Sequence, residues 1–130
     1  MPMQTLRRRQ DFLAAAQGPS RASPGVVVQM RRREDGDPAR VGYTVTRKLG
    51  GAVTRNRIRR RLREAVRTGA AACFRRGHDY VIIGRAATAG RPFQKLVTDI
   101  IGALDYLHAG TDRQRASSIP KAQAAGQENS

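Results

Sequence analysis

The segment from Gly50 to Arg67 combines the pattern of a folded helix with an unusual density of positive charge. Its last thirteen residues, 55–67, contain seven arginines. Apolar residues at the i, i+4, i+7 and i+8 spacing mark one buried stripe: Ile58, Leu62, Ala65 and Val66. Like charges three or four positions apart destabilise an isolated helix by about 0.2–0.5 kcal/mol per pair. The pattern therefore predicts a helix that is held by packing and whose outer face binds a polyanion.

The composition supports a nucleic-acid partner. The chain has 130 residues, enough for one domain with a modest core. Its net charge of +15 favours binding to polyanions. Of the 25 basic residues, 22 are arginine, whose planar fork suits phosphate and base edges. A GC-rich genome would explain the arginine-to-lysine ratio equally well, but it would not explain the clustering.

The remaining composition favours a cytoplasmic protein without a membrane segment. No apolar run reaches the roughly 18 residues of a membrane span, and the N-terminus has no signal-peptide pattern. The single cysteine, Cys73, excludes an intramolecular disulfide and fits a reducing compartment.

The order of predicted elements indicates an α+β fold. Apolar periodicity and β-branched runs predict a helix over 8–17, strands over 26–30, 40–46 and 79–85, the arginine helix, and a final helix from Pro92. Thr54 is a plausible N-cap of the arginine helix, and Gly69 is placed to end it, or nearly so, with residues 70–74 a possible extra turn. Residues 20–24 read as a turn-rich connection, with a possible extra strand before Val26. We expect a small α/β sandwich in one RNA-binding domain over 1–110 and a disordered tail over 111–130.

A second, weaker signal is a set of apolar and aromatic residues where the first helix could meet the sheet: Phe12, Val28 and Tyr43. Such a lining beside a basic surface is how proteins hold unpaired nucleotides. The same residues could equally be ordinary core.

The sequence offers no protein-based catalytic group or metal site. His78 and Asp79 are adjacent, so in a strand their side chains point to opposite faces and form no dyad. His108, near the expected end of the last helix, is explained by the helix dipole. There is no Cys/His cluster of zinc-ligand spacing.

The run from Arg40 to Glu64 closely resembles the signature of the bacterial ribonuclease P protein family. It reads as a strand, a basic loop, Gly-x-Ala-Val, and Arg-Asn-Arg opening a basic helix. The resemblance extends over about residues 5 to 108 and includes Asp11-Phe12, the strand at 79–83 and the last amphipathic helix.

This resemblance implies an α/β sandwich, like that of a small-subunit ribosomal protein domain, with a left-handed βαβ crossover. It also implies that an RNA subunit is the catalyst and uses Mg²⁺ to cleave the 5′ leader from precursor tRNA. The protein would bind this ribonuclease P RNA and the leader, favour precursor over product and lower the metal requirement.

Site residues carry over from the family by position. The residues that would bind the RNA subunit are Arg47, Lys48, Arg55, Asn56, Arg57, Arg59, Arg60 and Arg63. Leader binding would fall to Phe12, with Val28, Tyr43 and Val45 as possible floor residues. The chain departs from the family pattern at Ala16 and Gln29, where other members carry aromatic residues that stack on the leader.

Two other readings remain. A ribosomal protein or RNA chaperone could share the basic helix without taking part in cleavage. A protein-only nuclease would need carboxylate or histidine constellations that the sequence lacks.

Overall fold

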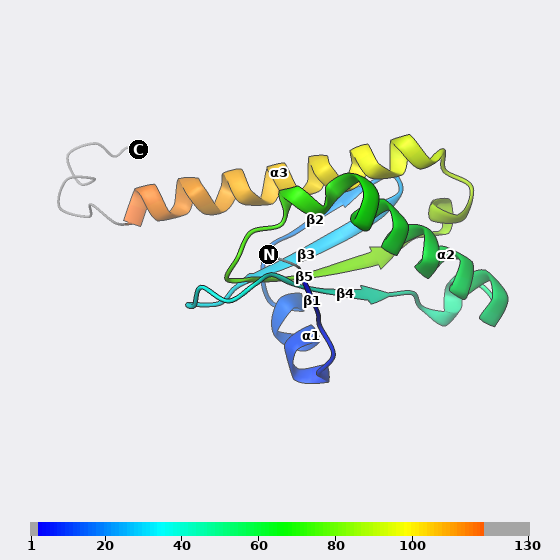
Figure 1. Ribbon diagram of the computed structural model, residues 1–130, viewed down its shortest axis with the longest axis horizontal. Helices are drawn as coiled ribbons and strands as arrows, with labels where there is room; N and C mark the ends of the chain where they lie inside the picture. The colour runs from blue at the N-terminus through cyan, green and yellow to red at the C-terminus, as the bar shows by residue number, and fades with distance from the viewer. Residues whose placement is uncertain (1–2, 119–130) are drawn as a thin grey trace.

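The computed structural model describes residues 3–118, which form a five-stranded sheet packed between helices (Figure 1). In chain order the main elements are β1 (Gln4–Thr5), α1 (Arg9–Ala16), β2 (Ser20–Ser23), β3 (Val26–Arg32), β4 (Arg40–Thr44), α2 (Ala52–Ala65), β5 (His78–Gly84) and α3 (Phe93–Ser118). The strand order is β1-β4-β5-β3-β2. This arrangement confirms the predicted α+β sandwich.

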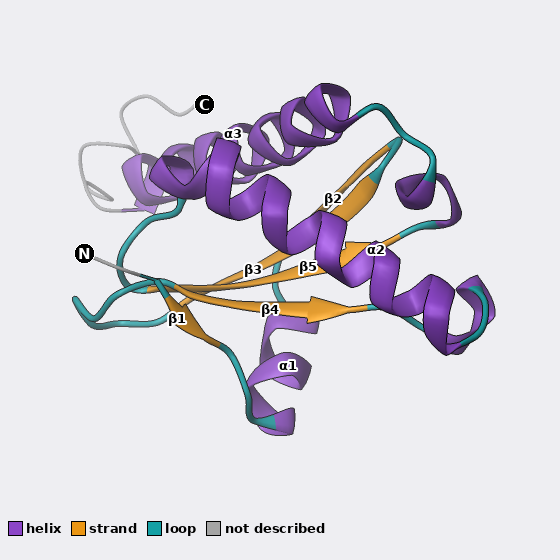
Figure 2. Ribbon diagram, turned by 45° about the vertical axis from the view of Figure 1, so that its right-hand side comes forward, coloured by secondary structure: helices purple, strands orange, loops and turns teal. Residues whose placement is uncertain are grey.

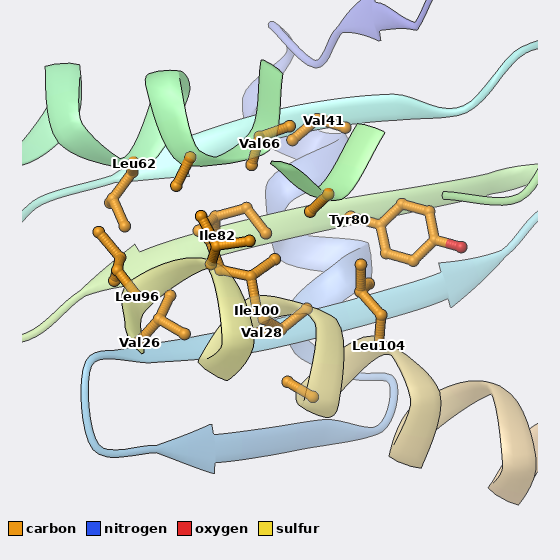
Figure 3. Packing of buried hydrophobic residues seen from close by; sticks show 14 of the residues in the cluster. Val26, Val28, Val41, Leu62, Val66, Tyr80, Ile82, Leu96, Ile100 and Leu104 are labelled. Atoms are coloured by element: carbon orange, nitrogen blue, oxygen red, sulfur yellow. The ribbon is translucent and has the colours of Figure 1, made fainter. Parts of the chain in front are cut away.

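The helices are divided between the two faces of the sheet, with α2 and α3 on one face and α1 on the other (Figure 2). The main core lies under α2 and α3, where Tyr80 and Ile82 of β5 pack against Leu62 and Leu104 (Figure 3). A smaller core lies under α1 and contains Val81. Since both faces of β5 are covered, residues 80–83 of this strand form a continuous apolar run rather than an alternation.

Helix α2 joins the two parallel strands β4 and β5. Parallel neighbours cannot be joined by a tight turn, so the chain must cross over the sheet. The predicted apolar stripe makes this crossing possible, because Ile58, Leu62 and Ala65 are all buried beneath the helix. The arginines are thereby left on the opposite side of α2.

The predicted start of the arginine helix is wrong. The helix begins at Ala52, and its N-cap residue is Gly51 rather than Thr54. Near the predicted end at Gly69, a π-helical turn, Val66–Ala70, follows the helix, and the 3₁₀ turn Ala71–Cys73 confirms the possible extra turn. A Cβ atom at Gly69 would lie 2.5 Å from Cγ1 of Val97. Gly69 therefore permits close packing of this turn on α3 rather than ending the helix.

Two expectations at the edges also need correction. Ser20–Ser23, expected as a connection, is the edge strand β2, paired antiparallel with β3; only the possible extra strand noted for this region is confirmed. Helix α3 continues to Ser118, so the predicted disordered tail is wrong for residues 111–118. The rest of the predicted tail, 119–130, lies outside the described residues. No helix within residues 3–118 has the length and apolar character of a membrane span.

Candidate nucleic-acid interface

The eight residues predicted to bind RNA lie on one continuous segment of the structure. Arg47 and Lys48 are exposed in a 3₁₀ turn, Arg47–Leu49, directly before α2. The other six lie on α2, on the sides of the helix that face away from the sheet. We call this set the arginine surface: Arg47, Lys48, Arg55, Asn56, Arg57, Arg59, Arg60 and Arg63. Because Ile58 and Leu62 are fully buried, the helix cannot rotate to hide these charges.

The positive charges of the arginine surface are not neutralised by the protein. Among residues 3–118, no carboxylate forms an ion pair with any of its members, and the side chains of Arg57 and Arg60 have no hydrogen-bond partner. Arg59 donates to Oδ1 of Asn56 at 3.3 Å, and Arg55 donates to the Gly50 carbonyl at 3.2 Å. The surface is therefore available to an external anion.

The two remaining arginines of the segment have structural partners. Arg61 donates to the backbone carbonyls of Thr88 and Arg91, which fixes α2 to the loop before α3. Arg67 pairs with Glu64 one turn earlier. The sequence pattern alone does not separate these two from the exposed arginines.

The first turn of α2 adds a favourable electrostatic field to the arginine surface. A helix leaves its first N–H groups without intrahelical acceptors and carries partial positive charge at that end. No side chain caps α2, and its first residues, from Ala52 to Thr54, are exposed beside Lys48. This end of the helix is therefore suited to phosphate, in addition to the charge of the arginines.

A second candidate surface lies on the opposite face of the sheet, around α1. Phe12 packs with Leu6, Ala15 and Val81 there and is only partly buried. Cross-strand pairing places further half-buried side chains on the same face, because Gln29 pairs with Val81, and Ile83 pairs with both Val27 and Thr44. We call this set the α1-side surface: Phe12, Val27, Gln29, Thr44 and Ile83.

The prediction that Val28, Tyr43 and Val45 share one surface with Phe12 is wrong. Val28 and Val45 are buried in the main core, and Tyr43 packs against that core. Adjacent strand residues point to opposite faces, and these three point towards α2 and α3. Sequence could not decide the face, because β3 is apolar on both sides at its start. The half-buried Val27 is the neighbour that it missed, whereas Gln29 is already apparent in the sequence as a departure from the family's leader-stacking pattern.

An ion-pair network lies beneath the α1 side of the sheet, centred on the fully buried Asp79. Its carboxylate accepts hydrogen bonds from Arg33 at 2.6 Å and from Arg40 at 2.7 Å. Arg31 and Arg40 also contact Asp11 of α1, at 3.5 and 3.4 Å. Burial alone would lower the pKa of Arg33, but hydrogen bonds to Asp35 and Asp79 raise it above its usual value. Arg33 is therefore a structural cation, not a ligand for RNA.

The two histidines also have structural roles. The rings of His78 and His108 lie beside Tyr80 in the main core, and the Tyr80 hydroxyl is 2.7 Å from Nε2 of His108. His108 lies in the middle of α3 rather than at its end, so the dipole explanation is wrong. As predicted, His78 and Asp79 face opposite sides of the sheet and form no dyad. In the described part of the chain, no group of three or more His, Cys, Asp or Glu residues could hold a metal ion.

Known proteins share both the sequence and the fold. The family model for ribonuclease P matches residues 2–108. The ribonuclease P protein component of Caulobacter vibrioides is 47% identical over 114 residues, covering 87% of this chain and 76% of the relative, and that of Gluconacetobacter diazotrophicus is 52% identical over 96 residues, covering 73% and 83%. The solved ribonuclease P protein of Thermotoga maritima matches with a TM-score of 0.64 at 29% identity, covering 80% of this chain and 94% of the other. The chain belongs to the ribonuclease P protein family.

Proposed function

We propose that this chain is the accessory protein subunit of a ribonuclease P, and that it binds the catalytic RNA through the arginine surface. The observation that carries the proposal is a helix fixed by its buried stripe, with Arg57 and Arg60 exposed and unpaired within residues 3–118. A surface with several unpaired guanidinium groups gains affinity by releasing counterions from RNA. The resemblance to the ribonuclease P family implies that this surface would lie close to the catalytic core of the RNA.

The α1-side surface is the proposed site for the 5′ leader of precursor tRNA. Phe12 offers a half-buried aromatic ring, which can stack on an unpaired base. Gln29 lies on the same face, where its amide can form hydrogen bonds with base edges. Arg7, Arg8 and Arg9 are exposed at the start of α1 and can attract the leader's phosphates. The leader and the RNA subunit would then occupy opposite faces of the sheet.

Magnesium would be held by the RNA and the substrate rather than by this chain. The buried carboxylates Asp11 and Asp79 already contact arginines, and Asp99 is paired with Arg91. These donor sets do not fit a hydrated divalent cation, which prefers free carboxylates. The protein would instead lower the repulsion between phosphates, which favours the compact, metal-bound RNA. We also propose that the chain assists the RNA catalyst in the cytoplasm.

The salt dependence of RNA binding tests the arginine surface. Arg57→Ala removes one cation that has no partner in the described protein, so it should weaken binding to ribonuclease P RNA and reduce the slope of log affinity against log salt by about one contact. Arg21→Ala, a change of the same charge on the exposed edge strand β2, is the matched control. An unchanged slope for Arg57→Ala would remove this residue from the interface.

A further inference from the structure

A groove of about 460 Å³ lies beside the arginine surface, on the α2 side of the sheet. It is bounded on one side by residues 3–5 at β1 and on the other by the last turn of α2 and the following π turn. Val41 and Val66, which lie near each other in Figure 3, form its floor. The volume falls within the range of about 300–1,000 Å³ that is usual for ligand sites.

The groove contains an aromatic ring with an unused polar group. Tyr43 lines it and is half-buried. Burial raises the pKa of Tyr43 to about 12, an effect that the nearby Arg63 only partly offsets. The hydroxyl is therefore protonated at neutral pH and can donate a hydrogen bond, yet among residues 3–118 no group accepts one from it.

The rim of the groove is cationic. The guanidinium of Arg63 lies over the Tyr43 ring, 5.6 Å from its centroid, and Arg67, which is paired with Glu64, lies one turn further along. No Asp or Glu lines the groove. An apolar floor, an aromatic wall and a positive rim form the combination that binds single nucleotides, whose bases stack and whose phosphates pair with arginine.

We propose that this groove holds one unpaired nucleotide of the RNA subunit. The base would lie against Tyr43 and the floor of Val41 and Val66, and its phosphate would contact Arg63, which has no carboxylate partner among residues 3–118. Arg63 also belongs to the arginine surface, so an RNA strand that follows α2 reaches the groove without changing direction. The inference rests on the proposed function, and it reassigns Tyr43 from the leader to the RNA subunit.

The position of the groove excludes the leader bound at Phe12 as its occupant. Phe12 lies over the opposite face of the sheet, where its ring approaches Gly42, whereas the adjacent Tyr43 side chain points towards α2. The two sites therefore lie on opposite faces of the sheet. A nucleotide in the groove would be fixed before any precursor tRNA binds.

Chemical probing of the RNA subunit, with each protein variant and without precursor tRNA, tests the inference. We expect wild-type protein to protect one unpaired nucleotide that remains reactive with Tyr43→Leu, a variant that keeps apolar volume but loses the flat ring. The affinity of the Tyr43→Leu variant for the RNA should fall about tenfold, as expected for one lost stacked base. Tyr43→Phe should retain the protection. Tyr106→Ala is the matched control, because Tyr106 is an exposed tyrosine with Arg21 over its ring at 4.1 Å, on α3.

The outcomes separate this inference from the proposed function. If wild type and Tyr43→Leu bind the RNA with the same affinity and the same protected nucleotides, the groove is not a nucleotide site, while the proposed function stands. If the protection requires precursor tRNA, the occupant is the leader and the inference is overturned. If the wild-type chain does not bind the RNA at all, both fail. Should Tyr43→Leu not fold, loss of the protection with the folded Tyr43→Phe would still contradict a stacking site.

Discussion

The ring of Phe12 lies against the backbone of Gly42, so closely that a Cβ atom at Gly42 would be 2.5 Å from Cζ of Phe12. This contact links α1, which packs against β3 and β5, to β4 and brings a leader-binding candidate onto the sheet. Gly42→Ala should therefore displace the ring and destabilise the protein by about 1–3 kcal/mol, the usual range for overpacking. Urea unfolding measures this effect. Gly102 is exposed on α3, and a Cβ atom added there would have no neighbour within 4 Å, so Gly102→Ala should be neutral or stabilising. Equal changes in the free energy of unfolding for the two variants would contradict the packing account.

The Phe12 ring should matter more for precursor tRNA than for mature tRNA, because only the precursor carries a leader. We expect Phe12→Ala to weaken precursor binding to the assembled holoenzyme by about tenfold, the value of one stacked base. Binding of mature tRNA should change little. Leu13→Ala, at the adjacent exposed apolar position of α1, is the control. Equal losses for the two RNAs would place Phe12 outside the leader site.

Asp79 should be the carboxylate whose neutralisation costs most stability. Asp79→Asn keeps the shape of the side chain but leaves Arg33 and Arg40 around an uncharged group at a fully buried position. Breaking a buried ion pair typically costs about 3–5 kcal/mol. Glu64→Gln, which removes an exposed pair with Arg67, should cost less than about 1 kcal/mol. Similar unfolding midpoints for the two variants would show that the Asp79 network is not a major source of stability.

Stability should fall in mild acid because of His108. Burial, with smaller contributions from Arg75 and His78, lowers the pKa of His108 to about 4. In the unfolded chain this pKa returns to about 6.5. Between these values the unfolded chain binds the extra proton and the folded one does not, so the free energy of unfolding decreases as pH falls from 6.5 to 4.

The comparison of wild type with His108→Gln tests this linkage. Burial also lowers the pKa of His78, so the variant should keep part of the acid sensitivity. The measurement is the urea midpoint at pH 7, 6 and 5. A variant whose midpoint falls as steeply as that of the wild type would show that folding does not lower the pKa of His108.

The sequence predicted α2 well because its two signals are independent of the rest of the fold. The apolar stripe at Ile58 and Leu62 needs only helical periodicity, and the exposed charges follow from it. The ends of the helix depended on tertiary contacts: packing of Gly69 on Val97 is not visible in the local sequence. The same limit explains the placement of Val28, because a strand covered on both sides carries no alternation that identifies its two faces.

Local sequence patterns also could not predict which charged residues have structural roles. Arg33 and Asp79 are 46 positions apart and meet only because β3 and β5 are neighbours. In the sequence, Arg33 is one of three consecutive arginines and is indistinguishable from a ligand for RNA. The helical extent of α3 past residue 110 was missed because its last turns contain few apolar residues.

The central claim is that this chain assists an RNA catalyst, and cleavage of a precursor tRNA at low magnesium tests it most directly. Bacterial ribonuclease P RNA would be assayed with the chain, without it, and with a variant carrying both Arg57→Ala and Arg60→Ala; the chain would also be assayed alone. We expect cleavage at the mature 5′ end to require both RNA and protein, and to be reduced with the variant. Tight RNA binding without any stimulation of cleavage would contradict the account and favour a chaperone or ribosomal protein, and cleavage by the chain alone would contradict it in favour of a protein nuclease.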